Sequence, residues 1–272
     1  MITYNLYRRL LRLPSFKGKS RLENLLRNHL KPKATRVQPG FDMYLDPLEW
    51  TQVTLLSGRT TEPATIELYG RLLKSNDVYV DVGAHVGFHA LVARRLIGGQ
   101  GRVVAIEPQP YNCDRILSNW QLNGYENLEL YVAVAGPLTT TVRLHNQTAS
   151  DKARLSLTLN APNDLPQVFC VPMLRLDAVI PPASNVPKVK LLKIDAEGYE
   201  AEVLSGLGLA CSRVDNIIIE VLTESEIQRK RSEEAVHLLR GWGFRLYDVR
   251  GTPYGGGMAL IESNLWATRN AI

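Results

Sequence analysis

From residue 77 onward, short runs of β-branched and other apolar residues alternate with helix-spaced apolar residues, and this alternation constrains the fold more than any other feature. The runs are mostly continuous, as strands buried on both faces of a parallel sheet require. We expect five such strands, at residues 78–82, 103–106, 128–134, 189–194 and 217–221. Strands that alternate with helices predict an α/β, Rossmann-like, doubly wound sheet. Residues 244–249 and 258–268 predict a terminal antiparallel hairpin.

The rest of the chain falls into two further sections. Residues 1–40 form a basic N-terminal arm, for which the leucine spacing predicts two helices separated near Pro14. Residues 41–272 form the main domain, and a helix is expected to begin near Pro63. Within that domain, residues 136–188 interrupt the βα rhythm and are expected to form inserted antiparallel strands or a long connection.

The charge of the chain is concentrated in the arm. The formal net charge is +5, but residues 1–36 hold ten basic side chains against one acidic side chain, Glu23. That segment therefore carries +9, and the remainder of the chain carries −4. The basic balance gives no reason to expect an anionic substrate in the main domain.

Acidic residues lie at or near the carboxyl ends of four expected strands. They are Asp81, Glu107, Asp195 and Glu220. In an open parallel sheet these ends face the ligand crevice. A carboxylate placed there without a partner is costly, so four of them together indicate a shared binding site rather than four separate structural roles.

The turn after the first strand indicates the kind of ligand. Gly83 and Gly87 allow a tight turn and a close approach of backbone to ligand. A dinucleotide fingerprint needs a third glycine where this chain has His85, so a pyrophosphate cradle is incomplete. Glu107 ends the next strand, where an acid binds ribose hydroxyls. Together these features favour a nucleoside without pyrophosphate, and S-adenosylmethionine fits that description.

Three segments together resemble the FkbM family of S-adenosylmethionine-dependent methyltransferases. They are the turn at residues 81–87, the pair Glu107–Pro108 and the segment at residues 193–200. Asn119, Asn123 and Ala133 also match the family pattern, and the resemblance extends over about residues 41–269. His85 departs from the pattern, which usually has asparagine there. The resemblance implies a class I methyltransferase fold with a mostly parallel seven-stranded sheet.

The resemblance also implies roles for individual residues. Those expected to bind S-adenosylmethionine are Asp81, Gly83, His85, Gly87, Glu107, Pro108, Ala133 and Asp195. Within this set the turn would flank the methionine portion, Glu107 would hold the ribose, Ala133 would lie by the adenine and Asp195 would face the amino group. Family members generally methylate hydroxyls of sugars or of polyketide-type metabolites, so we expect a small-molecule or glycan acceptor.

Methyl transfer to an alcohol also needs a base for the hydroxyl proton. The candidates near the crevice are His85, His89, Asp195, Glu197 and Glu220, of which Glu197 and His89 are favoured. His89 could equally be a packing residue. We expect no metal site at His85 and His89, because they have no third ligand nearby in sequence. Some sugar O-methyltransferases of this fold use magnesium, so an ion bound by carboxylates stays open as an alternative.

Two other functions stay open at this stage. The chain could be a nicotinamide-dependent oxidoreductase on a related sheet, although His85 counts against it. It could also be a non-catalytic nucleoside-binding module.

The expected partners depend on the arm. A basic amphipathic helix can lie on an anionic membrane surface, or it can pack as a lid or as the contact of a homodimer. Nucleic acid is not expected, because no basic stripe with interleaved aromatics continues into the main domain. Three widely spaced cysteines and the absence of a signal-peptide pattern favour the cytoplasm, with the inner membrane surface as the place of any peripheral contact.

Overall fold

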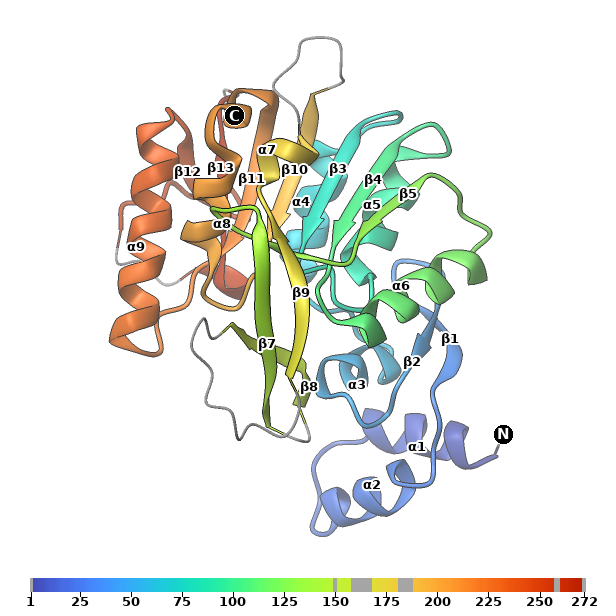
Figure 1. Cartoon of the computed structure of the whole chain (residues 1–272). Coiled ribbons are helices and arrows are strands. Elements are labelled where there is room, and N and C mark those ends of the chain that lie inside the picture. The colour runs from blue at the N-terminus through green and yellow to red at the C-terminus, as the bar shows by residue number, and fades with distance from the viewer. Residues whose placement is uncertain (1, 149–150, 158–167, 181–187, 257–259, 271–272) are drawn as a thin grey trace.

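The computed structural model describes residues 2–148, 151–157, 168–180, 188–256 and 260–270 of the 272-residue chain. Its centre is a seven-stranded sheet with the order β12-β13-β11-β10-β3-β4-β5 (Figure 1). These strands are β3 (Val78–Val82), β4 (Arg102–Ile106), β5 (Leu128–Tyr131), β10 (Val189–Ile194), β11 (Val214–Glu220), β12 (Arg245–Asp248) and β13 (Asn264–Thr268). The strands from β11 to β5 are parallel, whereas β13 is antiparallel to both its neighbours. The expected mostly parallel sheet with a terminal antiparallel hairpin is confirmed.

Helices cover both faces of this sheet. All five residues of β3 are buried, and their side chains alternate between two apolar cores. Val80 and Val82 belong to the core that contains α7 (Leu176–Val179), α8 (Glu200–Leu207) and α9 (Glu226–Gly241). Tyr79 faces the opposite core, which contains α4 (Pro63–Leu72) and α5 (Phe88–Ile97). Burial on both faces explains why the strands read as continuous apolar runs.

Local signals set the helix boundaries. Pro63 and Pro110 begin α4 and α6 (Pro110–Leu122), since proline is favoured in the first turn, where its missing N–H costs nothing. Ser225 and Gln228 form a capping box at the start of α9. Two short 3₁₀ helices, η1 (Gly208–Arg213) and η2 (Ile261–Ser263), precede β11 and β13.

The expected strand at residues 128–134 is divided between two sheets. β5 ends at Tyr131, and the chain then leaves the central sheet as the two-residue strand β6 (Val134–Ala135), which pairs with β9 (Val168–Leu174). The expectation of one strand is therefore wrong. An apolar run does not reveal where a chain turns from one core to another, and here the turn buries Ala133 in the core of α7–α9.

The second sheet belongs mainly to the segment expected as an insertion. Its order is β6-β9-β7-β8, with β7 (Thr140–Thr148), β8 (Asp151–Leu157) and β9 (Val168–Leu174). β7 is antiparallel to both β8 and β9. This sheet packs its own small core around Val142, Leu144, Val171 and Met173, and it extends away from the central sheet in Figure 1.

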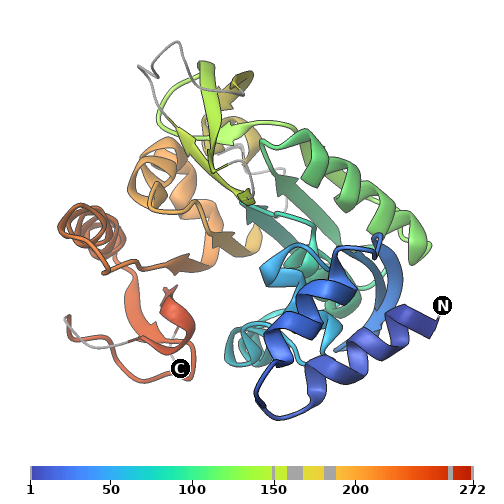
Figure 2. The same cartoon turned by 90° about the horizontal axis from the view of Figure 1, so that it is seen from below.

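The N-terminal residues form α1 (Ile2–Arg12) and α2 (Lys19–Arg27), and the interruption near Pro14 is confirmed. A hairpin of β1 (Lys33–Val37) and β2 (Phe41–Leu45) and then α3 (Trp50–Leu56) follow. α1 buries Tyr4, Tyr7 and Leu10. In Figure 2 the two helices lie side by side at one end of the molecule.

Two asparagines hold this N-terminal hairpin on α6. Asn119 Oδ1 accepts from the Tyr44 amide at 2.7 Å, and its Nδ2 donates to the Val86 carbonyl at 2.9 Å. Asn123 bonds both backbone groups of Asp42, at 2.9 and 2.8 Å. The spaced asparagines are thus structural: they satisfy the free edge of β2 and fix the turn after β3.

No helix among the described residues is long and apolar enough to cross a bilayer.

Candidate active site

A pocket of about 330 Å³ opens at the carboxyl ends of the parallel strands. Most residues expected to form the site line it, namely Asp81, Gly83, His85, His89, Glu107, Pro108, Ala133, Asp195 and Glu197. Gly87 and Glu220 are not among the lining residues. Gly87 instead precedes α5 with φ of 84°, and Glu220 ends β11, where burial and then the nearby carboxylates of Asp195 and Glu197 raise its pKa.

Gly83 is where the two halves of the pocket meet. Its φ is 79°, and a Cβ at this position would lie 1.8 Å from the carbonyl oxygen of Asp195. The Asp195 amide also donates to the Val82 carbonyl at 3.0 Å. Only glycine allows the ends of β3 and β10 to approach so closely, so Gly83 brings the two strand-end acids together.

His85 adopts the left-handed conformation, with φ of 50°. Asparagine and histidine are both enriched in this region among residues with a side chain. This shared tolerance gives a physical reason why histidine can replace the usual asparagine. The His85 amide donates to Glu107 Oε2 at 2.9 Å, so the backbone of the turn positions the acid of the next strand.

Glu107 is 5% exposed and is held by amides. Besides the His85 contact, its Oε1 accepts from the Gln109 amide at 2.9 Å and from Asn112 Nδ2 at 3.2 Å. Burial outweighs these hydrogen bonds and raises the pKa of Glu107 to about 7. Each carboxylate oxygen can accept further hydrogen bonds, so Glu107 can still bind hydroxyl groups of a ligand.

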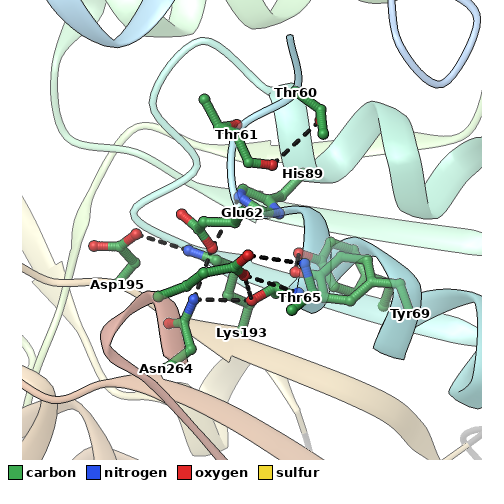
Figure 3. Close-up of polar contacts among 12 residues, drawn as sticks. Thr60, Thr61, Glu62, Thr65, Tyr69, His89, Lys193, Asp195 and Asn264 are labelled. Atoms are coloured by element: carbon green, nitrogen blue, oxygen red, sulfur yellow. Dashed lines mark hydrogen bonds and ion pairs between the residues drawn. The ribbon is translucent and has the colours of Figure 1, made fainter. Parts of the chain in front are cut away.

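Lys193 forms the opposite end of the pocket. Its ammonium is almost completely buried, and it pairs with Asp195 Oδ2 at 2.7 Å (Figure 3). On the neighbouring strand it lies in register with Asp81. Burial alone would lower the pKa of Lys193, but the charges of Asp195 and Glu62 outweigh it and hold that pKa well above its ordinary value. Lys193 is thus a fixed positive charge among acids.

Glu62 brings a third acid to Lys193 from the residue before α4. Its Oε2 accepts from Asn264 Nδ2 at 2.7 Å and lies 3.5 Å from His89 Nε2. Burial would raise its pKa, yet the charges of His89 and Lys193 hold it well below the ordinary range. The other nitrogen of His89, Nδ1, is buried without a hydrogen-bond partner in the described part of the chain, so Nε2 is engaged by Glu62 and Nδ1 has little contact with solvent.

Asp81 lies between the two ends and is fully buried. Burial raises its pKa, although the Lys193 charge opposes this shift. Its Oδ2 has no hydrogen-bond partner within the described residues. An orphaned carboxylate oxygen at a pocket wall is the kind of acceptor that a cationic or hydrogen-bonding ligand can satisfy.

Comparison with known proteins matches residues 81–246 to the model of the methyltransferase FkbM domain. The match covers more than half of the chain and includes the glycine turn, Glu107 and the Lys193 segment. The chain belongs to the FkbM methyltransferase family.

Several members and relatives are similar to this FkbM protein over part of their length. Hexuronic acid methyltransferase AglP of Haloferax volcanii is 26% identical over 164 residues, which cover 59% of this chain and 62% of AglP. Methyltransferase 1 of Beauveria bassiana is 25% identical over 158 residues, or 52% of this chain and 63% of that protein. The crystal structure of methyltransferase FkbM from Methylobacillus flagellatus aligns with 98% of this chain and 58% of that one, at 16% identity and a TM-score of 0.49. This chain therefore spans less than two thirds of the length of each of these proteins.

Another wall of the FkbM pocket comes from the turn before α8 and from α8, α9 and β7. Glu197 is exposed there and has φ of 52°. The Arg231 guanidinium lies 5.7 Å from the centre of the Tyr199 ring, and it donates to the Gly198 carbonyl at 3.2 Å. Leu144 contributes an apolar patch. This wall combines an accessible carboxylate with an aromatic ring and a positive charge.

Glu200, the last acid of the FkbM segment, has a structural role. Its Oε1 accepts from the amides of Ala196 and Gly198, at 2.9 and 3.1 Å, and thereby closes the turn before α8. Burial raises its pKa to about 7. Among the described residues, no three His, Cys, Asp or Glu side chains gather so as to hold a metal ion.

The sequence analysis missed Glu62, Lys193 and Arg231 as site residues. For Lys193 a signal existed, because a lysine inside a strand expected to be buried on both faces needs a counterion. Glu62 resembled an ordinary helix-terminus residue, and Arg231 one of several bases on α9. Neither position shows in sequence which distant residues it will meet.

Proposed function

We propose that this protein binds S-adenosylmethionine in the pocket and transfers its methyl group to a hydroxyl of a sugar, a glycan or a secondary metabolite. The observation that carries the proposal is the convergence of Asp81, Glu107 and Asp195 on one pocket beside the Gly83 turn. S-adenosylmethionine is a nucleoside with a sulfonium and an ammonium group, so carboxylates suit its charge. The unpartnered Oδ2 of Asp81 supports the fit from this side of the pocket.

In this proposal each end of the pocket holds one part of the donor. Glu107 accepts hydrogen bonds from the ribose hydroxyls, and the small side chain of Ala133 leaves room for the adenine. Asp195, fixed by Lys193, faces the amino group with Asp81. His85, Pro108 and the two glycines shape the turn around the methionine portion. Bound S-adenosylmethionine supplies an activated methyl group, so the protein needs chiefly to align the reactants and to exclude water.

We propose Glu197 as the base that accepts the proton of the acceptor hydroxyl. It lines the pocket and is exposed, so an incoming alcohol can reach it. His89 was the other favoured candidate, but its ring is paired with Glu62 on one side and buried on the other. His89 fits a positioning residue for Glu62 better than a base.

The acceptor we propose is a sugar, preferably one that carries a carboxylate. A sugar ring can stack on Tyr199, and the adjacent Arg231 guanidinium can bind a carboxylate. The name of AglP as a hexuronic acid methyltransferase supports the same class.

Titration calorimetry with S-adenosylhomocysteine and with NAD⁺ tests the cofactor. We expect binding of the first and none of the second, and a Glu107→Gln variant should bind much more weakly. Glu129→Gln is the matched control, because Glu129 is a half-exposed partner of Arg102 outside the pocket. Binding of NAD⁺ instead would support the oxidoreductase, and binding of neither would contradict both proposals.

Transfer of a radiolabelled methyl group to glucuronosides and to the matching glucosides tests the reaction. We expect the wild type to methylate the glucuronoside. Glu197→Gln should lower kcat at least about 100-fold. Arg231→Ala should raise the KM for the glucuronoside but not the KM for the glucoside. S-adenosylhomocysteine binding without transfer to any hydroxyl acceptor would leave a non-catalytic nucleoside-binding module.

A further inference from the structure

We propose that α1, α2 and the turn between them form a docking surface for an anionic phospholipid bilayer. The inference concerns residues 6–25 and does not depend on the reaction proposed for the pocket. It rests on three observations: exposed apolar side chains, their placement at one end of the molecule, and the charge that accompanies them.

This short segment exposes an unusual amount of apolar surface. The side chains are Leu6, Leu13, Phe16, Leu22 and Leu25, which are 52, 51, 47, 41 and 62% exposed. The other large apolar side chains exposed by the described residues are spread over six positions between residues 48 and 227. Single exposed leucines are normal, but five within twenty residues form a patch, and such patches mark interaction sites.

Two members of the patch belong to α1 and to the residue that follows it, beside the face that α1 buries. Tyr4, Tyr7 and Leu10 are buried inward. Leu6 lies at the border of this buried face and is half exposed, and Leu13 follows the last residue of the helix and is exposed to a similar degree.

α2 has the same division. None of its residues is fully buried, and Leu26 makes its contact with the core. Leu22 and Leu25 are 41% and 62% exposed, although Leu22 is only one turn before Leu26. Because α1 and α2 lie side by side at one end of the molecule (Figures 1 and 2), the two helices and the Phe16 turn bring the five exposed apolar side chains to the same end, and we refer to them together as the apolar layer.

Basic side chains accompany this layer. Arg9, Lys17 and Arg21 are exposed within the same segment, and residues 1–36 carry a formal charge of +9. Apolar side chains beside exposed bases match the interface of an anionic bilayer, where the apolar groups enter the acyl boundary and the bases meet the headgroups. A second copy of this surface would oppose like charges, so charge complementarity favours the bilayer over an arm-to-arm homodimer.

The arm is held firmly enough to orient the domain on such a surface. Arg8 Nε donates to the Leu56 carbonyl at 3.0 Å, and Arg12 Nε donates to the Ser57 carbonyl at 2.9 Å. Both carbonyls lie at the end of α3, the helix whose residues Thr51 and Leu55 line the pocket. Docking through the arm would therefore fix where the pocket lies relative to the bilayer.

Co-sedimentation of the full chain with vesicles tests the proposal. We expect binding to vesicles of phosphatidylcholine mixed with phosphatidylglycerol, little binding to phosphatidylcholine alone, and weaker binding as salt is raised. The triple variant Arg9→Glu/Lys17→Glu/Arg21→Glu should lower the affinity at least about 100-fold, since each base near the surface contributes about fivefold. Arg229→Glu/Lys230→Glu/Arg250→Glu, three exposed bases elsewhere, is the matched control and should bind as the wild type does.

A second variant tests the apolar layer separately. Phe16→Ser/Leu22→Ser/Leu25→Ser changes exposed side chains, so the fold should persist, as circular dichroism can verify. Affinity for the anionic vesicles should fall at least about tenfold, whereas Leu209→Ser/Ile227→Ser should have no effect.

Three results would overturn the proposal. The first is equal sedimentation with neutral and anionic vesicles, and the second is wild-type affinity in both arm variants. The third is the absence of vesicle binding together with a dimer, seen by analytical ultracentrifugation, that dissociates in the serine variant. The last result would assign the patch to a homodimer contact. Each of these readouts is independent of methyl transfer, so a failure here does not bear on the proposed reaction.

Discussion

The two ends of the pocket both bury carboxylates, but they stabilise them differently. At one end Asp81, Asp195 and Glu62 surround the buried ammonium of Lys193. At the other end Glu107 is held by two backbone amides and the side-chain amide of Asn112. The first end has a cation built into the fold. The second end has only hydrogen bonds, and burial raises the pKa of Glu107 to about 7. Protonation, rather than a cationic side chain, therefore neutralises this carboxylate.

Because of this difference, we expect the Lys193 end to be important for folding and the Glu107 end to respond to ligand and pH. Removing Lys193 would leave several buried charges unpaired, so that end is tied to folding. Glu107 gains or loses its proton near neutral pH, so that end can respond to ligand and pH without unfolding. The predictions below test this contrast, beginning with the largest effect.

Lys193→Met should destabilise the protein by about 3–5 kcal/mol, because breaking a buried charge cluster leaves uncompensated charges behind. Methionine keeps most of the volume, so packing changes little. Lys190→Met is the matched control on the same strand. Its ammonium pairs with Asp215 at 3.2 Å in a partly exposed site, where such pairs contribute at most about 1 kcal/mol. Urea unfolding of both variants measures the difference, and equal losses would contradict the structural role of Lys193.

Gly83→Ala should separate the two ends of the pocket. The new Cβ would overlap the Asp195 carbonyl oxygen at 1.8 Å, so the two strands must move apart, at a cost of about 3 kcal/mol. Gly18→Ala is the control, since its φ of 91° and ψ of −3° are left-handed but no atom lies within 4 Å of the added Cβ. That change should cost only about 1–2 kcal/mol of backbone strain.

The measurement for this pair is urea unfolding together with S-adenosylhomocysteine binding. We expect both to fall for Gly83→Ala and binding to survive in Gly18→Ala. Intact binding in a destabilised Gly83→Ala variant would mean that the close contact of β3 and β10 supports the fold but not the pocket.

The site residues also differ in how well the sequence could predict them. Asp81, Glu107 and Asp195 are local features, since each ends an apolar strand and the parallel topology brings such ends together. Glu62 and Asn264 are 202 residues apart in the chain and meet only because α4 packs against η2, the turn that leads into β13. Their contact depends on tertiary packing, which a local sequence pattern does not predict.

The same reasoning applies to the fold. The period of apolar residues identified the central strands and both arm helices, because burial imposes that period directly. It failed at residues 128–134, where the chain changes from one sheet to another inside an apolar run. It also could not distinguish inward leucines from outward ones in the arm, since Leu25 and Leu26 are equally apolar.

Protein stability without ligand should fall as pH rises from about 5 to 8. The pKa of Glu107 and that of Glu200 are both raised to about 7 in the folded state, above the ordinary value of 4.5. The folded state therefore binds more protons than the unfolded state in this window, and stability is lost as pH rises through the folded pKa. Glu107 alone should contribute on the order of 2 kcal/mol to this loss.

Unfolding free energies at several pH values check this expectation. Glu107→Gln should remove about a third of the slope or less, because Glu200 still titrates and so does Glu220, whose pKa burial raises to about 9. Glu129→Gln should leave the slope unchanged. A stability that rises with pH over this range would contradict the burial-driven shifts at both residues.

S-adenosylhomocysteine should bind more tightly as pH rises from 6 to 8, by up to about tenfold. Ribose hydroxyls donate hydrogen bonds, so they favour the carboxylate form of Glu107, and at pH 6 a group whose pKa is about 7 is mostly protonated. Calorimetry in buffers of different ionisation enthalpy would also detect one proton released on binding near pH 6. Glu107→Gln should bind weakly with no pH dependence, while Glu129→Gln should follow the wild type. If the wild-type affinity for S-adenosylhomocysteine did not change with pH, protonation would not neutralise Glu107 in the free protein. The two ends of the pocket would then differ only in how their carboxylates are hydrogen-bonded.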